Sequence, residues 1–297
     1  ARTGKESRMQ LAVAMPHAEA LVAYLGRCPG VGRVVVAGSY RRARETIGDL
    51  DILVTADTGR AITDRFIRYP EVREVLAHGE TKASVRLRNR LQVDVRVVPD
   101  ESYGAALLYF TGSKHHNVVL RQLAQERGFK LNEYGVFRGA VRVAGGTEAS
   151  VYAAVGLPWI PPELRENRGE FDAAKEGRLP TLVELQDLVG DLHAHTTATD
   201  GRHSLKEMAD AARRRGLRYL AITDHSRRLT MARGLTPARL SAQMDEIDRL
   251  NRDLTDIRLL KGIEVDILED GSLDLPDDVL GRLDLVVGAV HSRFKLS

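Results

Sequence analysis

The sequence predicts a multidomain protein with both α/β and α+β regions. Its 297 residues exceed the usual size of one domain, so each of two domains could bury its own core. In the first half, short apolar strands alternate irregularly with helices. After about residue 186 the pattern becomes strand, helix, strand, which is typical of βα units around a parallel sheet or barrel.

The composition is that of a globular chain, with 43% hydrophobic and 29% charged residues. The net charge is only +3, but arginine strongly outnumbers lysine among the 44 basic residues. Arginine clusters bind phosphates, although a coding bias would give the same excess. The single cysteine, Cys28, excludes an intramolecular disulfide and suits a reducing cytoplasm. No apolar run approaches the roughly 20 residues that span a bilayer.

The elements of the first half follow from its apolar spacing. Residues 11–25 carry apolar side chains at helical spacing. Short buried strands are expected around "VVVAGS" and "LDILVTA", and a strand pair at "KASVRL" and "LQVDVRVVP". Residues 103–128 are helical on both sides of a break at 111–113, and short strands follow through residue 146. Residues 166–185 combine prolines and charges without periodicity, so we expect a linker there.

Two carboxylates, Asp49 and Asp51, stand at the start of the strand "LDILV". Residues i and i+2 of a strand share a face, so both project together. A third carboxylate, Asp94, lies inside the apolar alternating strand "LQVDVRVV", where an ionised group needs a partner. If the two strands are neighbours, the three carboxylates converge and could hold two divalent ions for phosphoryl displacement.

The residues before this strand suit a triphosphate. Gly38 and Ser39 can present backbone N–H groups, and Arg42 offers a forked donor. The alternative is purely structural: the first two carboxylates cap a turn, and Asp94 pairs with Arg96 or Arg86. For the three carboxylates together we favour the metal site, because buried charges are rare without a reason.

The motifs "GSYRRARETIGDLDILV", "VDVRVV", "LLYFTGSKHHN" and "LNEYGVF" resemble, in this order, the palm and thumb of family X DNA polymerases. The resemblance covers about residues 11–166. It implies catalysis and metal binding by Asp49, Asp51 and Asp94. It further implies nucleotide binding by Gly38, Ser39, Arg42, Gly48, Tyr109, Phe110, Gly112 and Asn117, and DNA contacts by Arg96, Arg121, Glu133 and Tyr134.

Two positions depart from the pattern of the animal enzymes in this family. Gln92 replaces an arginine two residues before the third carboxylate, and Lys114 replaces an acid beside the incoming base. In the same region we interpret His115 and His116 as a solvated pair, because adjacent helical residues do not face one ligand. Tyr109 and Phe110 could alternatively be core aromatics at a helix end.

A second set of metal-ligand residues follows residue 190. His193 and His195 share one face of a strand end, a spacing suited to two imidazoles on one ion. The remaining candidates stand at or beyond further strand ends: Asp200, His225, Glu264 and His291. Mixed imidazole and carboxylate ligation favours Mn²⁺, Zn²⁺ or Fe²⁺ over Mg²⁺.

This second set resembles a PHP (polymerase and histidinol phosphatase) domain, from about residue 183 onward. The resemblance implies a distorted seven-stranded (β/α)7 barrel with a trinuclear metal site. It also implies 3′-5′ exonuclease activity and, in many members, abasic-site endonuclease activity. Further ligands of that pattern are absent from the sequence. We expect Asp224 to orient an imidazole and His203 to be a loop residue.

We therefore predict five regions: the end of a fingers-like helical region (1–30), a nucleotidyltransferase palm (31–105), a thumb (106–165), a linker (166–185) and an incomplete PHP domain (186–297). Because the sequence starts without Met and stops after a strand-like run, we expect truncation at both ends.

The predicted function is gap-filling DNA synthesis for repair, with Mg²⁺ or Mn²⁺ at the first site, joined to 3′-5′ trimming. The expected partners are gapped or primer-template DNA and deoxynucleoside triphosphates. We expect a cytoplasmic, nucleoid-associated monomer that binds no membrane. The alternative is a nucleotidyltransferase and phosphoesterase that acts on small non-DNA phosphates, and a non-catalytic DNA scaffold ranks last.

Overall fold

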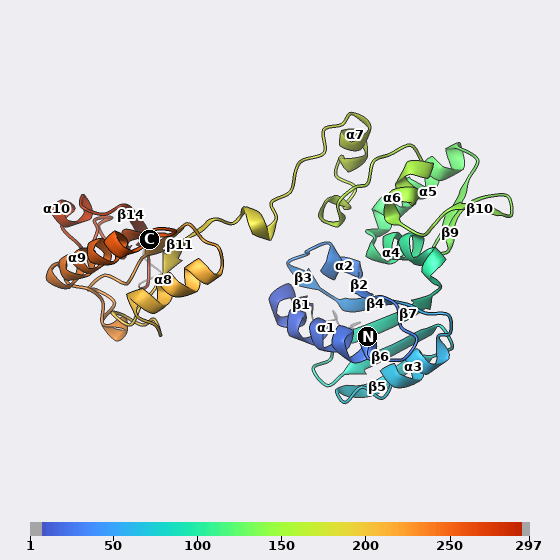
Figure 1. Cartoon of the computed structure of the whole chain (residues 1–297), viewed down its shortest axis with the longest axis horizontal. Coiled ribbons are helices and arrows are strands. Elements are labelled where there is room, and N and C mark those ends of the chain that lie inside the picture. Colours follow the sequence, from blue (N-terminus) through green and yellow to red (C-terminus); the bar gives the residue numbers. More distant parts are fainter. Residues whose placement is uncertain (1–7, 293–297) are drawn as a thin grey trace. The chain divides into compact units, whose positions relative to one another are not determined.

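The computed structural model describes residues 8–292 (Figure 1). Residues 1–7 and 293–297, the outer ends of the predicted fingers-like and PHP regions, lie outside the described residues. The chain divides into two compact units, Ala1–Pro180 and Thr181–Ser297. None of the helices within residues 8–292 is long and apolar enough to cross a membrane.

A five-stranded mixed sheet forms the first half of the first unit. Its strand order is β2-β4-β7-β6-β5. Strands β4 and β7 are parallel, and every other neighbouring pair is antiparallel. The bounds are β2 (Val34–Val36), β4 (Asp49–Thr55), β7 (Gln92–Val98), β6 (Lys82–Leu87) and β5 (Val72–His78). The two carboxylate-bearing strands are therefore neighbours, which is the condition on which the predicted convergence of the carboxylates depended.

The two faces of this sheet differ. Helices α1 (Leu11–Gly26) and α3 (Arg60–Phe66) pack on the face that carries Leu50, Ile52 and Val93. Because side chains alternate along a strand, the carboxylates of β4 and β7 lie on the opposite face. Short elements complete this part: β1 (Met9–Gln10), α2 (Gly38–Arg41), β3 (Thr46–Ile47) and η1 (Asp100–Ser102).

The second half of this unit is mainly helical. A second core joins Leu108, Leu120, Tyr152 and Phe171. They belong to α4 (Tyr103–Thr111), α5 (Lys114–Glu126), α6 (Glu148–Ala154) and α7 (Glu170–Lys175). The strands β8 (Lys130–Asn132), β9 (Gly135–Arg138) and β10 (Val141–Ala144) form a small antiparallel sheet, and η2 (Pro162–Leu164) precedes α7.

The start of the expected linker is packed against this core. Phe171 and Ala174 of α7 are buried with the thumb residues, and the first compact unit extends to Pro180. Since a six-residue helix with only two buried apolar side chains leaves little periodic signal, the sequence pattern did not indicate it. We accordingly propose a shorter linker, which begins at residue 181 and includes η3 (Leu185–Asp187).

The second unit is built from βα units. Its four strands are parallel and follow chain order: β11 (Gly190–Ala194), β12 (Tyr219–Ile222), β13 (Arg258–Asp266) and β14 (Leu285–Ala289). The connections contain α8 (Leu205–Arg214), η4 (Thr230–Ala232), α9 (Pro237–Asp253) and α10 (Asp277–Leu280). Parallel strands end at one edge of the sheet, so the loops that carry the histidines gather there.

Candidate functional site

The first candidate site begins with the pairing of β4 and β7. The two strands run in register, so Asp51 lies directly beside Asp94, and Asp49 beside Gln92. Burial, followed by repulsion from Asp49 and Asp94, raises the pKa of Asp51 to about 7. Carboxylates that raise one another's pKa are stabilised when a divalent cation lies between them, so this group fits a divalent-cation site.

Asp94 has two hydrogen-bond partners on the same sheet. The hydroxyl of Ser84 donates to its Oδ1, and Nε2 of Gln92 donates to its Oδ2 at 2.9 Å. Arg86 pairs instead with Glu74 at 2.9 Å, and Arg96 lies over the ring of Phe110, 5.3 Å from its centroid. The structural alternative, in which either arginine neutralises Asp94, is therefore wrong.

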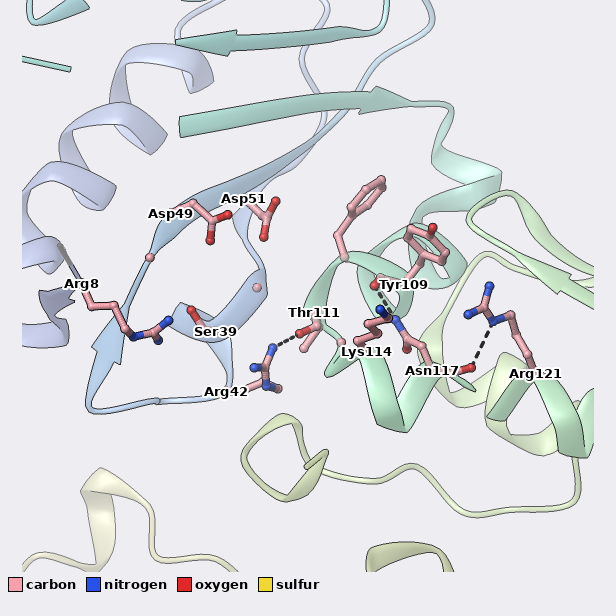
Figure 2. Close-up of a pocket in the computed structure, with 14 residues that line it drawn as sticks. Arg8, Ser39, Arg42, Asp49, Asp51, Tyr109, Thr111, Lys114, Asn117 and Arg121 are labelled. Atoms are coloured by element: carbon pink, nitrogen blue, oxygen red, sulfur yellow. Dashed lines mark hydrogen bonds between the residues drawn. The ribbon is translucent and has the colours of Figure 1, made fainter. Parts of the chain in front are cut away.

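A pocket of about 560 Å³ opens beside the carboxylates (Figure 2). It brings together residues that are far apart in the sequence, from α2, β4, α4 and α5. Its predicted lining residues are Gly38, Ser39, Arg42, Gly48, Asp49, Asp51, Tyr109, Phe110, Gly112, Asn117 and Arg121. Lys114 and two residues that the sequence did not indicate, Arg8 and Thr111, also line it.

At the end of the pocket near Asp51, the position of Gly38 leaves no room for a side chain. Gly38 has a positive φ of 60°, and a Cβ there would lie 2.5 Å from Oδ2 of Asp51. Arg42 donates from Nε to Glu166 at 2.8 Å and from Nη1 to the carbonyl of Thr111. Arg8 is held by its Nε bond to Oγ1 of Thr46, at 2.9 Å. Backbone and two guanidinium groups thus surround the space next to the carboxylates.

The other end of the pocket is aromatic and polar. The rings of Tyr109 and Phe110 form an edge contact with centroids 5.1 Å apart. Asn117 donates from Nδ2 to the carbonyl of Tyr109 at 2.7 Å, and its buried Oδ1 has no hydrogen-bond partner in the structure. Arg121 donates from Nε to the carbonyl of Asn117 at 3.3 Å. Since buried acceptors are normally paired, Asn117 retains capacity for a ligand donor.

Three predicted DNA contacts lie away from the pocket lining. Glu133 and Tyr134 form the turn between β8 and β9, and Arg96 points from β7 toward Phe110. Tyr134 is exposed. These three positions stay predictions, because DNA contacts would be made outside the pocket.

The prediction that His115 and His116 form a solvated pair is correct for the first residue and wrong for the second. His115 is exposed, but His116 is fully buried. Its Nδ1 bonds to Oε1 of Glu170 and its Nε2 to the hydroxyl of Tyr152, each at 2.8 Å. Burial lowers its pKa to about 4, so the ring is neutral. The partners lie in α6 and α7, which the local sequence could not indicate.

The second candidate site lies at the strand ends of the second unit. Glu264 occupies its centre: Oε2 lies 3.4 Å from Nε2 of His193, 3.5 Å from Nε2 of His195 and 3.0 Å from Nδ1 of His225. Oε1 lies 3.4 Å from Nε2 of His291. All of the described predicted ligands therefore converge, including Asp200, whose two oxygens lie 3.4 Å from His195 and His225.

The donor set of this second site fits metal ions. The Nδ1 atoms of His195 and His225 are buried without a hydrogen-bond partner in the structure, although each lies near a carboxylate oxygen. Burial, and then the neighbouring His225, lowers the pKa of His195, which favours the neutral imidazole that binds metals. Three overlapping groups of three ligands each could hold a cation.

Two carboxylates have roles around the second site that differ from expectation. Asp224 orients no imidazole. It is buried and accepts hydrogen bonds from Thr196, Thr199 and Gln243, so it fixes the loop after β11. Asp266 instead bonds Nδ1 of His291 at 3.0 Å. Asp266 lies two residues after Glu264 on the same strand, so the two side chains share a face. This spacing in "GIEVD" is the sequence signal that could have identified Asp266.

Models of known domain families match the chain in the same order as these sites. The DNA polymerase beta palm matches residues 17–115, the DNA polymerase beta thumb residues 106–166, and the PHP domain residues 191–295. Both polymerase matches fall within the first compact unit, and the PHP match falls within the second.

Individual relatives agree with these matches. The chain is 41% identical to the DNA polymerase/3′-5′ exonuclease PolX of Bacillus subtilis, over 98% of this chain and 52% of that protein. It is 30% identical to DNA polymerase lambda of Rattus norvegicus, over 44% of this chain and 28% of that protein. A probable phosphatase of Thermoanaerobacter is 33% identical over 35% of this chain and 41% of its own length.

The chain thus spans about half the length of the PolX relative. Within that span it matches a palm, a thumb and a PHP domain in one order, and the candidate ligand residues of the palm and of the PHP domain each lie close together. On these grounds the chain belongs to the bacterial family X polymerases that have a C-terminal PHP domain.

Proposed function

We propose that the first unit extends a DNA primer by metal-dependent nucleotidyl transfer and fills short gaps during repair. The observation that carries this proposal is the in-register pairing of β4 and β7, which sets Asp51, a residue of the pocket lining, beside Asp94. A small non-DNA phosphate substrate is less well supported, because the relatives over this region are named as DNA polymerases.

In this proposal each part of the pocket has one task. Asp49, Asp51 and Asp94 hold two Mg²⁺ or Mn²⁺ ions, which when bound lower the pKa of the primer hydroxyl and neutralise the leaving pyrophosphate. The backbone around Ser39 and the guanidinium of Arg42 bind the triphosphate. Tyr109 and Phe110 lie against the sugar.

The base and the template belong to the thumb side of the pocket. Asn117 offers its unpaired Oδ1 to the edge of the base. Arg121 extends beyond Asn117 (Figure 2) and would contact the template. Glu133, Tyr134 and Arg96 are proposed as further DNA contacts.

Primer extension tests this function. On gapped DNA with Mg²⁺, Asp94→Ala should lower the rate by at least about a hundred- to a thousandfold, the loss typical of removing one electrostatic contact to a reacting group. Asp57→Ala, which removes an exposed acid just beyond β4, should extend at the wild-type rate. Extension that survives Asp94→Ala would refute the polymerase assignment.

We further propose that the second unit trims a 3′ end by metal-activated attack of water on a phosphoester. The convergence of four imidazoles on Glu264, with Asp200 beside two of them, supports it, and this donor set fits Mn²⁺, Zn²⁺ or Fe²⁺. Release of mononucleotides from a 3′ end is the measurement. Abasic-site cleavage is a second activity that the same site could support. A protein that acts on these DNA substrates would be found at the nucleoid. We propose that it acts there as a monomer.

A further inference from the structure

Arg42 is held by a carboxylate that belongs to a distant part of the chain. Its Nε donates to Oε1 of Glu166 at 2.8 Å, across 124 positions of sequence, and its Nη1 donates to the carbonyl of Thr111. Two bonds of this kind fix the plane of a guanidinium group. Its other N–H groups are therefore oriented by the protein before any ligand arrives.

Glu166 itself is held in place from both sides. Arg165, the preceding residue, is fully buried and donates to Glu148 at 2.6 Å. Glu170 is buried and bonds His116 at 2.8 Å. We call residues 161–180 the strap. Because buried contacts hold the strap before and after Glu166, the position of this carboxylate is fixed, and it in turn restricts the movement of Arg42.

Arg41, the residue before Arg42, forms an ion pair away from the pocket and serves as a comparison for the pair between Arg42 and Glu166. Arg41 forms a two-fold contact with Glu148, with both N–O distances at 2.8 Å, and Glu148 is buried. Burial would raise the pKa of Glu148, but hydrogen bonds from Arg41 and Arg165 hold it at about 2. Arg41 does not line the pocket, whereas Arg42 does.

We propose that Glu166 is a positioning residue for the incoming nucleotide: it holds the Arg42 guanidinium in the orientation that binds the triphosphate. The negative charge of Glu166 opposes phosphate binding. The proposal therefore requires that the affinity gained from a fixed guanidinium exceeds the affinity lost to this repulsion. Solvent weakens the repulsion, because the side chains of Arg42 and Glu166 are both partly exposed. The proposal rests on the polymerase function proposed above.

Single-nucleotide incorporation on gapped DNA, with the deoxynucleoside triphosphate varied, tests the proposal. Glu166→Ala should raise the KM for the nucleotide about five- to tenfold, the effect of one lost hydrogen bond to a charged group, and leave kcat within about twofold. Glu166→Gln should stay near wild type, because its amide oxygen still accepts from Arg42. Glu166→Asp keeps the charge but is too short, so its KM should rise.

Two further variants separate positioning from general effects. Glu163→Ala removes an exposed negative charge from the same strap and should leave KM unchanged. Glu166 also lies 3.6 Å from Nε of the half-exposed Arg44, but the proposal assigns its effect on the nucleotide to Arg42. In an Arg42→Ala background, Glu166→Ala should therefore add nothing to the rise in KM. Where Glu166→Ala fails to fold, Glu166→Asp carries the same prediction.

Three results would overturn the inference. A lower KM in both Glu166→Ala and Glu166→Gln would mean that the carboxylate competes with the triphosphate. An equal effect of Glu163→Ala would mean that only net charge matters, and additive losses with Arg42→Ala would mean an independent role. A wild-type chain that does not extend primers would instead refute the proposed function itself.

Discussion

Asp51 is the residue at which protons and metal ions compete. Its pKa of about 7 is raised by burial and by the two neighbouring carboxylates. Between about pH 4 and pH 7 the folded protein keeps a proton that the unfolded chain has released. The contribution of Asp51 to the stability of the metal-free protein should therefore fall as the pH rises through this window, which the difference between wild type and a variant at this position would show.

Asp51→Asn should remove that loss, because the amide stays neutral at every pH. Without metal, the variant and the wild type should melt at similar temperatures near pH 4. At pH 8 the variant should melt at least about 2 °C higher. Thermal melts in a chelator measure this, and Mg²⁺ should raise the wild-type melting temperature more at pH 8 than at pH 6. Equal melting of both proteins at pH 8 would contradict the raised pKa.

At the scale of elements, one imidazole joins three helices. His116 of α5 donates from Nδ1 to Glu170 of α7 and accepts at Nε2 from the hydroxyl of Tyr152 in α6. The ring also stacks on Phe171, with centroids 4.5 Å apart. This arrangement requires a neutral ring, in line with the pKa of about 4 that burial imposes.

His116→Asn should destabilise the first unit by about 1 to 3 kcal/mol at pH 7, because Glu170 and Tyr152 would lose buried partners. The stabilisation that His116 provides relative to this variant should also shrink from about pH 6.5 down to pH 4, where the unfolded chain takes up a proton that the folded ring does not bind. Denaturant unfolding at several pH values is the measurement, with the exposed His115→Ala as the unaffected control.

These elements also show what the sequence could predict. Alternation along "LDILV" was enough to place Asp49 and Asp51 on one face, since strand periodicity is local. That Asp94 joins them depends on the pairing and register of β4 and β7, which no local pattern gives. The strap was missed, because the bonds from Glu166 to Arg42 and from Glu170 to His116 join positions 124 and 54 residues apart. Adjacent histidines carry no signal of which one turns inward. The pocket lining of α4 and α5 came from family resemblance rather than from periodicity.

At the scale of the whole molecule, each of the two units brings together a set of candidate metal ligands. The first set is carboxylate only, whereas the second is mainly imidazole. Hard oxygen ligands suit Mg²⁺, and mixed sets suit transition metals. Synthesis and trimming should therefore respond separately to both metals and mutations.

After chelation, Mg²⁺ alone should restore primer extension, whereas trimming should need Mn²⁺ or Zn²⁺. The double variant His193→Ala and Glu264→Ala should lose trimming but extend primers at the wild-type rate. Parallel assays of both activities on the same labelled substrate provide the readout. Trimming that persists in this variant would exclude the second unit as its source.

The pairing of β4 with β7 limits how this protein can change in length. Each residue of a strand turns its side chain to the face opposite that of its neighbour. One residue inserted within either strand ahead of a carboxylate would turn that carboxylate toward α1 and α3, into an apolar core. Longer loops between these strands cost little free energy, whereas a one-residue insertion in either strand should remove the carboxylate from the site unless a β-bulge restores the register.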